Sequence, residues 1–382
     1  MDKVCEYKDC TGCGLCSAQC PKKCISMESG NQFGHLFPKI DQAICIDCGL
    51  CQKNCPAIHP VEQRQPLAAY AAWSRDDDDY KSSTSGGAAS VLSQHVISKG
   101  GVVYGCAMLP DIDVRHIRID NIDDLYKLKG SKYVQSNVTD IYPQLRKDIN
   151  DGRLTLFTGT PCQVAAVKNM FKEQPENLIL VDLICHGVPS LHMLRQHIKN
   201  VANYSHYDTV LFREGNGIYV IAVVVDGKEV YRRYFNMPRY KDFYINSFFD
   251  GYTFRDCCYN CRYACPQRVS DITIGDFWRL GKVIPADYIP EHPHGISVML
   301  PSTEKGKNLI EAITSKMNLY KRSVDEAVGG NDQLRFPTTI NKRKIIFRSL
   351  YPVMGSSAYY LAVMDKYLNY NLKRLIKKLV KE

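Results

Sequence analysis

Two cysteine-rich segments near the start of the chain share one spacing. Each contains four cysteines, the fourth is followed by proline, and the second segment comes 35 residues after the first. They are Cys10, Cys13, Cys16 and Cys20-Pro21, and Cys45, Cys48, Cys51 and Cys55-Pro56. Three thiolates spaced in this way can wrap one corner of a 4Fe-4S cluster, and the cysteine before proline then ligates the other cluster of the pair. The spacing therefore predicts one cluster held by Cys10, Cys13, Cys16 and Cys55, and a second held by Cys45, Cys48, Cys51 and Cys20.

Zinc and disulfide bonds are the alternative uses for so many cysteines. Zinc prefers paired ligands, which two runs of four cysteines do not match, and Gly12, Gly14 and Gly49 leave room for the backbone to fold tightly around sulfur. The N-terminus has no apolar signal region, and no segment approaches the ~18 apolar residues of a membrane span. We therefore expect a cytoplasmic protein, in which clustered cysteines favour metal over disulfides. Cys5 and Cys24 fall outside the repeat and are interpreted as spare thiols.

The chain is too long for a ferredoxin alone. Its 382 residues suggest two or three domains. We expect a dicluster domain over residues 1–57, a linker over 58–66, a larger domain over 67–340 and a basic tail over 341–382. Strands are expected at 67–73, 101–108, 154–157, 178–184, 219–225 and 228–235, and helices at 87–98, 139–149, 162–171 and 191–201. This alternation predicts an α/β domain with a mixed sheet, preceded by a small α+β ferredoxin domain with a hairpin formed by 24–28 and 37–40. Asp226-Gly227 is typical of a type I′ hairpin turn.

A second set of cysteines lies in the expected α/β domain. Cys162 opens a helix directly after a strand, Cys185 follows another strand, and Cys258 and Cys261 form a chelating pair. Thr160 and Pro161 suit the first positions of that helix, whose N-terminus favours a thiolate. These four cysteines could hold a third 4Fe-4S cluster, or they could be unrelated buried thiols plus a zinc pair. Cys257 and Cys265 lie close enough in sequence to replace one of them, and Cys106 is expected in the core.

Three further segments have the composition of anion or ligand sites. Ser82–Gly87 combines hydroxyls and glycines before a helix, which suits an anion. Lys132 lies among small polar residues, and Asp276 and Trp278 follow a short strand. A flexible loop, a solvated lysine and a structural turn are the respective alternatives.

Taken in order, these segments resemble one family. They are Ser83–Gly87, Gly130–Ser136, Gly159–Gln163, Cys185–Gly187, Cys258 with Cys261, and Asp271–Trp278. The chain is similar over about residues 67–340 to the beta subunits of coenzyme F420 hydrogenases and dehydrogenases, a group that includes a plant chlorophyll-pathway reductase. The resemblance implies a flavoprotein with FAD, or FMN, beside a 4Fe-4S cluster on Cys162, Cys185, Cys258 and Cys261. It makes Ser85, Gly86, Gly87, Lys132 and Tyr133 the candidate flavin-binding residues and names no catalytic residue.

The function that this resemblance implies is oxidoreduction. Electrons would pass between a redox partner protein or ferredoxin, the clusters, the flavin and a small-molecule hydride acceptor or donor. An electron-transfer subunit with no substrate of its own is the alternative, and a protein that keeps its clusters as structural staples is a third. Neither the substrate nor the direction of electron flow follows from the fold.

The net charge of +9 is concentrated at the C-terminus. Residues 341–382 contribute +8, leaving +1 for the rest of the chain. Residues 371–381 place their leucine, isoleucine and valine side chains on one face of a helix and five Lys/Arg on the other. A helix docked on the domain and a peripheral contact with the inner membrane face or an acidic partner are both compatible with this pattern. No nucleic-acid partner is expected, because no platform of aromatic and basic side chains accompanies the tail.

Overall fold

The structure is a computed structural model that describes residues 1–171, 173–214, 217–235, 242–285 and 291–364. Its largest element is an eight-stranded sheet with the order β13-β3-β12-β11-β7-β6-β4-β5. The strands are β3 (Ala69–Ser74), β4 (Val102–Leu109), β5 (Asp113–Ile119), β6 (Thr155–Gly159), β7 (Leu178–Leu183), β11 (Ile272–Asp276), β12 (Ser297–Pro301) and β13 (Met317–Arg322). β4, β6, β7 and β11 are parallel to one another, and the remaining strands pair antiparallel at both sides.

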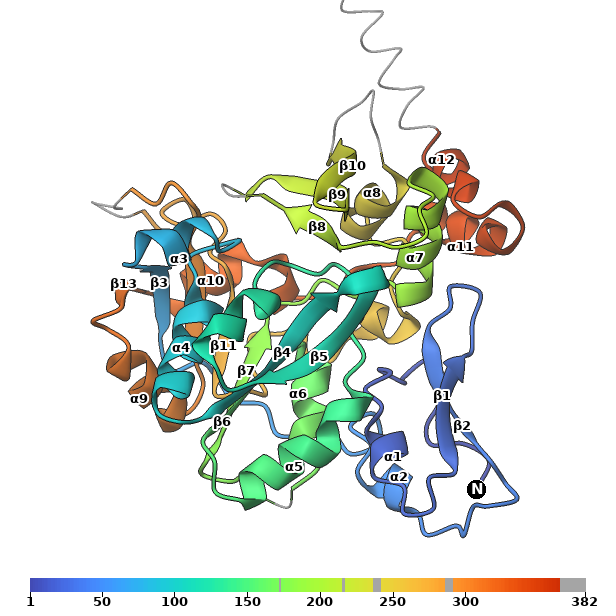
Figure 1. Ribbon diagram of the computed structural model, residues 1–382, viewed down its shortest axis with the longest axis horizontal. Helices are drawn as coiled ribbons and strands as arrows, with labels where there is room; N and C mark the ends of the chain where they lie inside the picture. Colours follow the sequence, from blue (N-terminus) through green and yellow to red (C-terminus); the bar gives the residue numbers. More distant parts are fainter. Residues whose placement is uncertain (172, 215–216, 236–241, 286–290, 365–382) are drawn as a thin grey trace, which may run out of the picture.

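Helices cover both faces of this sheet (Figure 1). The helical elements are α3 (Asp77–Lys81), α4 (Ala88–Ser98), η1 (Pro110–Ile112), η2 (Ile122–Leu128), η3 (Thr139–Ile141), α5 (Tyr142–Asn150), α6 (Pro161–Lys168), α9 (Glu304–Ala312), α10 (Val324–Gly330) and η6 (Asp332–Leu334). Leu92 of α4 and Ile310 of α9 share one buried apolar cluster with the strands, and Leu145 of α5 and Val164 of α6 share another. Burial on both faces explains why the parallel strands β4 and β7 are mainly apolar.

A smaller sheet forms a second lobe, which stands above the first in Figure 1. Its strands are β8 (Thr209–Arg213), β9 (Tyr219–Val225) and β10 (Lys228–Tyr234), and its helices are α7 (Leu191–Val201), α8 (Phe243–Phe249), α11 (Lys342–Met354) and α12 (Ser357–Ala362). β9 and β10 form a hairpin whose Asp226 and Gly227 both have positive φ, 50° and 70°. This is the type I′ geometry that the sequence predicts.

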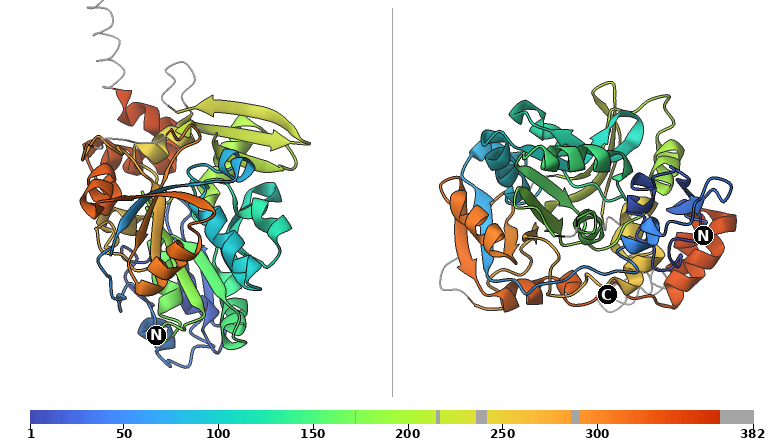
Figure 2. Two further views of the ribbon diagram at one scale, coloured as in Figure 1. Left: turned by 90° about the vertical axis from the view of Figure 1, so that its left-hand side faces the viewer. Right: turned by 90° about the horizontal axis from the view of Figure 1, so that it is seen from below.

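The N-terminal block is small and lies against both lobes (Figure 2). It consists of α1 (Leu15–Ala18), the hairpin β1 (Ile25–Ser29) and β2 (Leu36–Ile40), and α2 (Leu50–Lys53). The main body contributes a further short helix, η5 (Asp256–Asn260). Gly14 and Gly49 precede α1 and α2 with matching φ values of 72° and 73°, so the sequence repeat is also a structural repeat. Phe33, at the tip of the hairpin, is fully buried in the second lobe against Phe347 and Tyr351.

The predicted fold class is confirmed, with a mixed-sheet α/β domain after a small dicluster-type block. The basic helix expected at 371–381 lies outside the described residues. Of the expected tail, α11 and α12 pack on the second lobe through Phe347, Ala358 and Tyr359. Within the described ranges, no helix has the length and apolar character that a membrane crossing requires.

Candidate redox site

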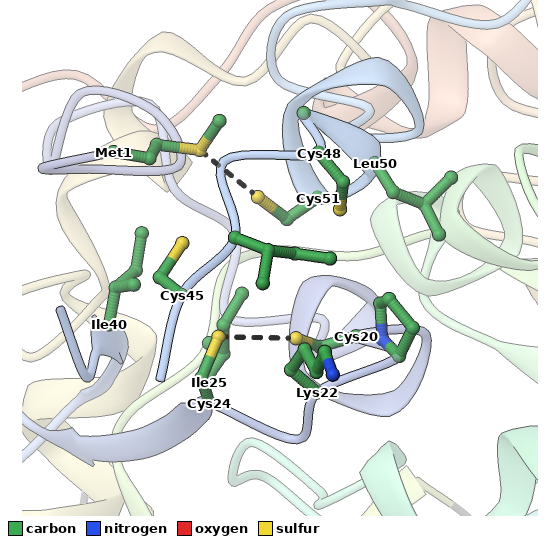
Figure 3. Close-up of a pocket in the computed structure, with 13 residues that line it drawn as sticks. Met1, Cys20, Lys22, Cys24, Ile25, Ile40, Cys45, Cys48, Leu50 and Cys51 are labelled. Atoms are coloured by element: carbon green, nitrogen blue, oxygen red, sulfur yellow. Dashed lines mark hydrogen bonds between the residues drawn. The ribbon is translucent and has the colours of Figure 1, made fainter. Parts of the chain in front are cut away.

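The two cysteine repeats of the N-terminal block surround two separate small cavities. Cys10, Cys13, Cys16 and Cys55 line one of them. Cys20, Cys45, Cys48 and Cys51 line the other, which Figure 3 shows in close-up. Each cavity thus collects three cysteines of one repeat and the cysteine before proline of the other, as expected for two ferredoxin-type clusters.

Each cavity also has a fifth cysteine, which the sequence pattern did not place. Cys24 lies beside Cys20, with 3.4 Å between the sulfur atoms. Cys5 hydrogen-bonds to Cys10 and Cys55, and this bond lowers the pKa of Cys10 to about 6 and that of Cys55 to about 7. These thiols are therefore neighbours of the predicted ligands, although they lie outside the spacing that identified those ligands.

The four cysteines of the second set converge behind the carboxyl ends of the parallel strands. Cys162 lies in the first turn of α6, Cys185 follows β7, and Cys258 and Cys261 lie in and after η5. Burial raises the pKa of Cys162 to about 12 and also raises that of Cys185, and in both cases the charges of the other cysteines add to the rise. The four thiols are half-buried, and those of Cys162, Cys185 and Cys261 are each harder to ionise because of other cysteines in the set. A strong positive centre such as iron would favour the thiolate form of all four.

The two cysteines whose role the sequence left open lie differently. Cys257 hydrogen-bonds to Cys258, and this bond lowers the pKa of Cys258. Cys265 instead donates to Gln63 Oε1 at 3.2 Å and to the carbonyl of Arg262 at 3.4 Å. Cys265 therefore has partners outside the set, whereas Cys257 adjoins it.

The hydroxyl of Tyr263 is buried near both the second set and the cavity lined by Cys10, Cys13, Cys16 and Cys55. Tyr263 is 5% exposed, and within the described part of the chain its Oη has no hydrogen-bond partner. The charges of Cys162, Cys261 and Cys13 all act on this hydroxyl. Buried hydroxyls are normally hydrogen-bonded, and cluster sulfur accepts such bonds. The residues present therefore fit a cluster held by the second set.

A cavity of about 340 Å³ lies at the carboxyl ends of β6, β7 and β11. This is where ligands bind in open α/β sheets, and the volume is within the range of roughly 300–1,000 Å³ for small-molecule and cofactor sites. Four of the five candidate flavin residues line it: Ser85, Gly87, Lys132 and Tyr133. Asp276, Trp278 and Cys185 line it too, so one cysteine belongs both to the second set and to the cavity wall.

The two ends of the cavity differ in chemistry. One end is polar, with Ser83, Ser85 and Gly87 at the N-terminus of α4, near Lys132. The other end is aromatic: Tyr133 stacks on Phe248 at 4.5 Å between ring centres, and Tyr219 adjoins Phe249. There Arg213 pairs with Asp276 at 2.7 Å. The polar end suits phosphate, and the aromatic end suits a planar ring.

Gly86, the fifth candidate flavin residue, is not among the residues that line the cavity. A Cβ at this position would come within 2.0 Å of the Ala72 carbonyl oxygen and 2.7 Å of the Ser297 nitrogen. The glycine thus allows the backbone before α4 to pack directly on strands β3 and β12.

Gly86→Ala is accordingly expected to lower stability by about 1–3 kcal/mol, the usual cost of overpacking. Backbone atoms on both sides cannot yield as a side chain could. Chemical denaturation of the reconstituted protein would measure the loss, with Ser85→Ala as the neighbouring control. Equal stability of the two variants would contradict this role.

Fold and site together define an iron–sulfur protein of the electron-transfer class. Residues 9–58 match the 4Fe-4S dicluster domain, and residues 152–327 match the C terminus of the coenzyme F420 hydrogenase/dehydrogenase beta subunit. Both matches agree with the sequence motifs: a dicluster domain lies at the N-terminus, and the region after it is similar to the C terminus of this beta subunit.

Among solved structures, a chain from the F420-reducing [NiFe] hydrogenase complex of Methanosarcina barkeri is similar at 16% identity and a TM-score of 0.47, over 71% of this chain and 90% of that chain. No curated protein matches the sequence.

Proposed function

We propose that this protein is an iron–sulfur flavoprotein oxidoreductase that links a one-electron donor to a small-molecule hydride acceptor or donor. The observation that carries the proposal is the double position of Cys185, which adjoins Cys162, Cys258 and Cys261 and also lines the large cavity. A cluster on these four cysteines would lie directly beside a flavin in that cavity. A flavin, when bound, can collect single electrons and exchange them as a hydride.

The positions of the cysteine sets support one order for the electron path. Cys48 is exposed, so the cysteine set that contains it would receive electrons from a soluble redox partner such as a ferredoxin. Cys13, from the other ferredoxin set, packs in one apolar cluster with Cys162 and Cys261. Each set thus adjoins the next, from the protein surface to the cavity wall.

Within the cavity, the protein would bind and orient a flavin nucleotide. The N-terminus of α4, the serine hydroxyls and Lys132 would hold its phosphate, and the aromatic side chains would flank its ring. His116 does not serve as an acid here, because burial lowers its pKa to about 4 and its Nε2 is engaged by the Thr158 carbonyl at 2.9 Å.

Anaerobic purification followed by iron, sulfide and flavin analysis tests this proposal. About twelve irons and one flavin per chain are expected, since each of three clusters holds four irons. About eight irons without flavin would reject the oxidoreductase and leave only an electron carrier. Colourless, iron-free protein that is still folded would reject both.

A further inference from the structure

Arg255 is a buried cation without a carboxylate partner. It is 1% exposed, and among the described residues no Asp or Glu lies within ion-pair distance of it. Arg268, which is equally buried at 2%, pairs with Asp182 at 3.0 Å. A buried charge is costly unless an opposite charge compensates it. The contrast between the two arginines indicates that Arg255 has another counter-charge.

The Arg255 guanidinium contacts the first ferredoxin set, which is Cys10, Cys13, Cys16 and Cys55. Nε donates to the Cys10 carbonyl at 2.6 Å, and Nη2 donates to the Leu36 carbonyl at 2.7 Å and to Cys10 Sγ at 3.4 Å. Nη1 donates to Gln135 Oε1 at 3.3 Å. Of these four acceptors, only the sulfur of Cys10 can become an anion. The counter-charge is therefore expected from this thiolate and the cluster that it would ligate.

The backbone of Arg255 hydrogen-bonds to the segments that carry the second cysteine set. Its carbonyl accepts the N–H of Cys258 at 3.0 Å, and its own N–H donates to the carbonyl of Val188, three residues after Cys185, at 3.1 Å. Its charge also acts on Cys162 and Cys258. Arg255 thus lies between the two sets and contacts both.

The cysteine loop of the N-terminal block leaves space for this guanidinium. A Cβ on Gly12, between Cys10 and Cys13, would meet Arg255 Nη1 at 2.7 Å. On the other side, the guanidinium lies over the Phe37 ring at 4.1 Å. The position of the charge is therefore fixed by the loop and the hairpin together.

We propose that Arg255 is a positioning residue that compensates the negative charge of both the first ferredoxin cluster and the third cluster and raises their reduction potentials. The proposal rests on the function proposed above. One electron entering either cluster adds one negative charge and makes or breaks no bond, so a fixed cation nearby favours the reduced state. Arg255 is buried between the N-terminal block and the main body, so the attraction between its charge and the cluster is large and only weakly screened by salt. The same residue would hold the ferredoxin block in place for electron transfer.

Redox titration of the cluster-loaded protein, followed by electron paramagnetic resonance, tests this role. In Arg255→Gln, we expect the midpoint potentials of both clusters to fall, so that the ratio of reduced to oxidised cluster at a fixed potential drops at least tenfold, which is 59 mV for a one-electron couple. Arg255→Lys keeps the charge and should recover most of the shift. The cluster on Cys20, Cys45, Cys48 and Cys51 should keep its potential in both variants.

Arg348→Gln is the matched control. Arg348 also lies between the main body and the N-terminal hairpin: it donates to the Phe254 carbonyl at 3.0 Å and covers the Phe33 ring at 4.5 Å. Unlike Arg255, it has a carboxylate partner, Asp256. Its loss should leave the cluster potentials unchanged. Unchanged potentials in a fully loaded Arg255→Gln would overturn the proposal.

Two further outcomes remain decisive. If Arg255→Gln does not assemble its clusters but Arg255→Lys does, the charge is required, as proposed; if both fail, the role is one of packing and the proposal is overturned. If the wild type lacks a third cluster, the proposed function fails, whereas the shift of the first ferredoxin cluster still decides the role of Arg255.

Discussion

Replacing Cys162 by alanine is expected to lower the iron content from about twelve to about eight per chain, because a 4Fe-4S cluster needs four thiolates. Cys162 belongs to the set next to the cavity, and it shares no cavity with the ferredoxin cysteines. Alanine is the best helix former, so α6 should persist. The two ferredoxin clusters should remain and still accept electrons. Iron and sulfide analysis with spectra of the reduced protein would measure the loss.

The same variant should interrupt electron flow between the ferredoxin block and the flavin. With the cluster beside Cys185 removed, a reduced ferredoxin donor should reduce the variant's remaining clusters but not its flavin. Stopped-flow absorbance under anaerobic conditions separates these two events. Rapid flavin reduction in the variant would show that electrons reach the cavity by another route.

Two neighbouring cysteines provide the controls. Cys265→Ala should keep all clusters, because the thiol of Cys265 bonds to Gln63 and a carbonyl instead of the set. Cys257→Ala removes a hydrogen-bond donor to Cys258 and should keep the iron while shifting the potential of the third cluster downward. Loss of four irons in Cys257→Ala would instead show that Cys257, and not its neighbour Cys258, is a ligand of the third cluster.

The features that sequence predicted well are those set by local spacing. The strand–helix alternation, the Asp226-Gly227 turn and the start of α6 at Thr160 and Pro161 each depend on a few adjacent residues. The order of the strands in the sheet does not depend on adjacent residues, because β3 pairs with β12 and β13, which come more than 200 residues later in the chain. Such pairing is fixed by the packing of distant apolar faces, which periodicity does not specify.

The same distinction holds at the site. The repeats located the ferredoxin cysteines, but Cys5 and Cys24 had no spacing to identify them, and their positions follow from how the block folds. Tyr263 and Arg255 are recognisable only through burial and through partners that are present or missing. Gly86 lies within the serine–glycine motif predicted for the flavin, yet its contacts concern backbone packing. Motif spacing indicated the dicluster domain at residues 9–58, whereas expectations for individual residues required the surroundings of each side chain.

Lys132→Met is expected to weaken the binding of flavin nucleotide by about 10- to 150-fold. Lys132 lines the polar end of the cavity, and its Nζ donates to the carbonyls of Leu128 at 3.0 Å and Lys129 at 2.7 Å. An ammonium has three donors, so one remains for a ligand. Burial lowers the pKa of Lys132, and within the described residues no carboxylate pairs with it, so a phosphate would supply the missing counter-charge. A hydrogen bond to a charged group contributes about 1.5–3 kcal/mol.

Ligands with and without a phosphate distinguish a phosphate contact of Lys132 from a general effect on the cavity. Titration of the flavin-free, cluster-loaded protein should show weaker binding of FAD and FMN to Lys132→Met, but equal binding of riboflavin, which has no phosphate, to the variant and the wild type. Lys132→Arg should retain most of the affinity. Lys127→Met is the matched control, because Lys127 is half-exposed and pairs with Asp124 away from the cavity. An equal loss for riboflavin would mean that Lys132 shapes the cavity and that the phosphate is bound elsewhere.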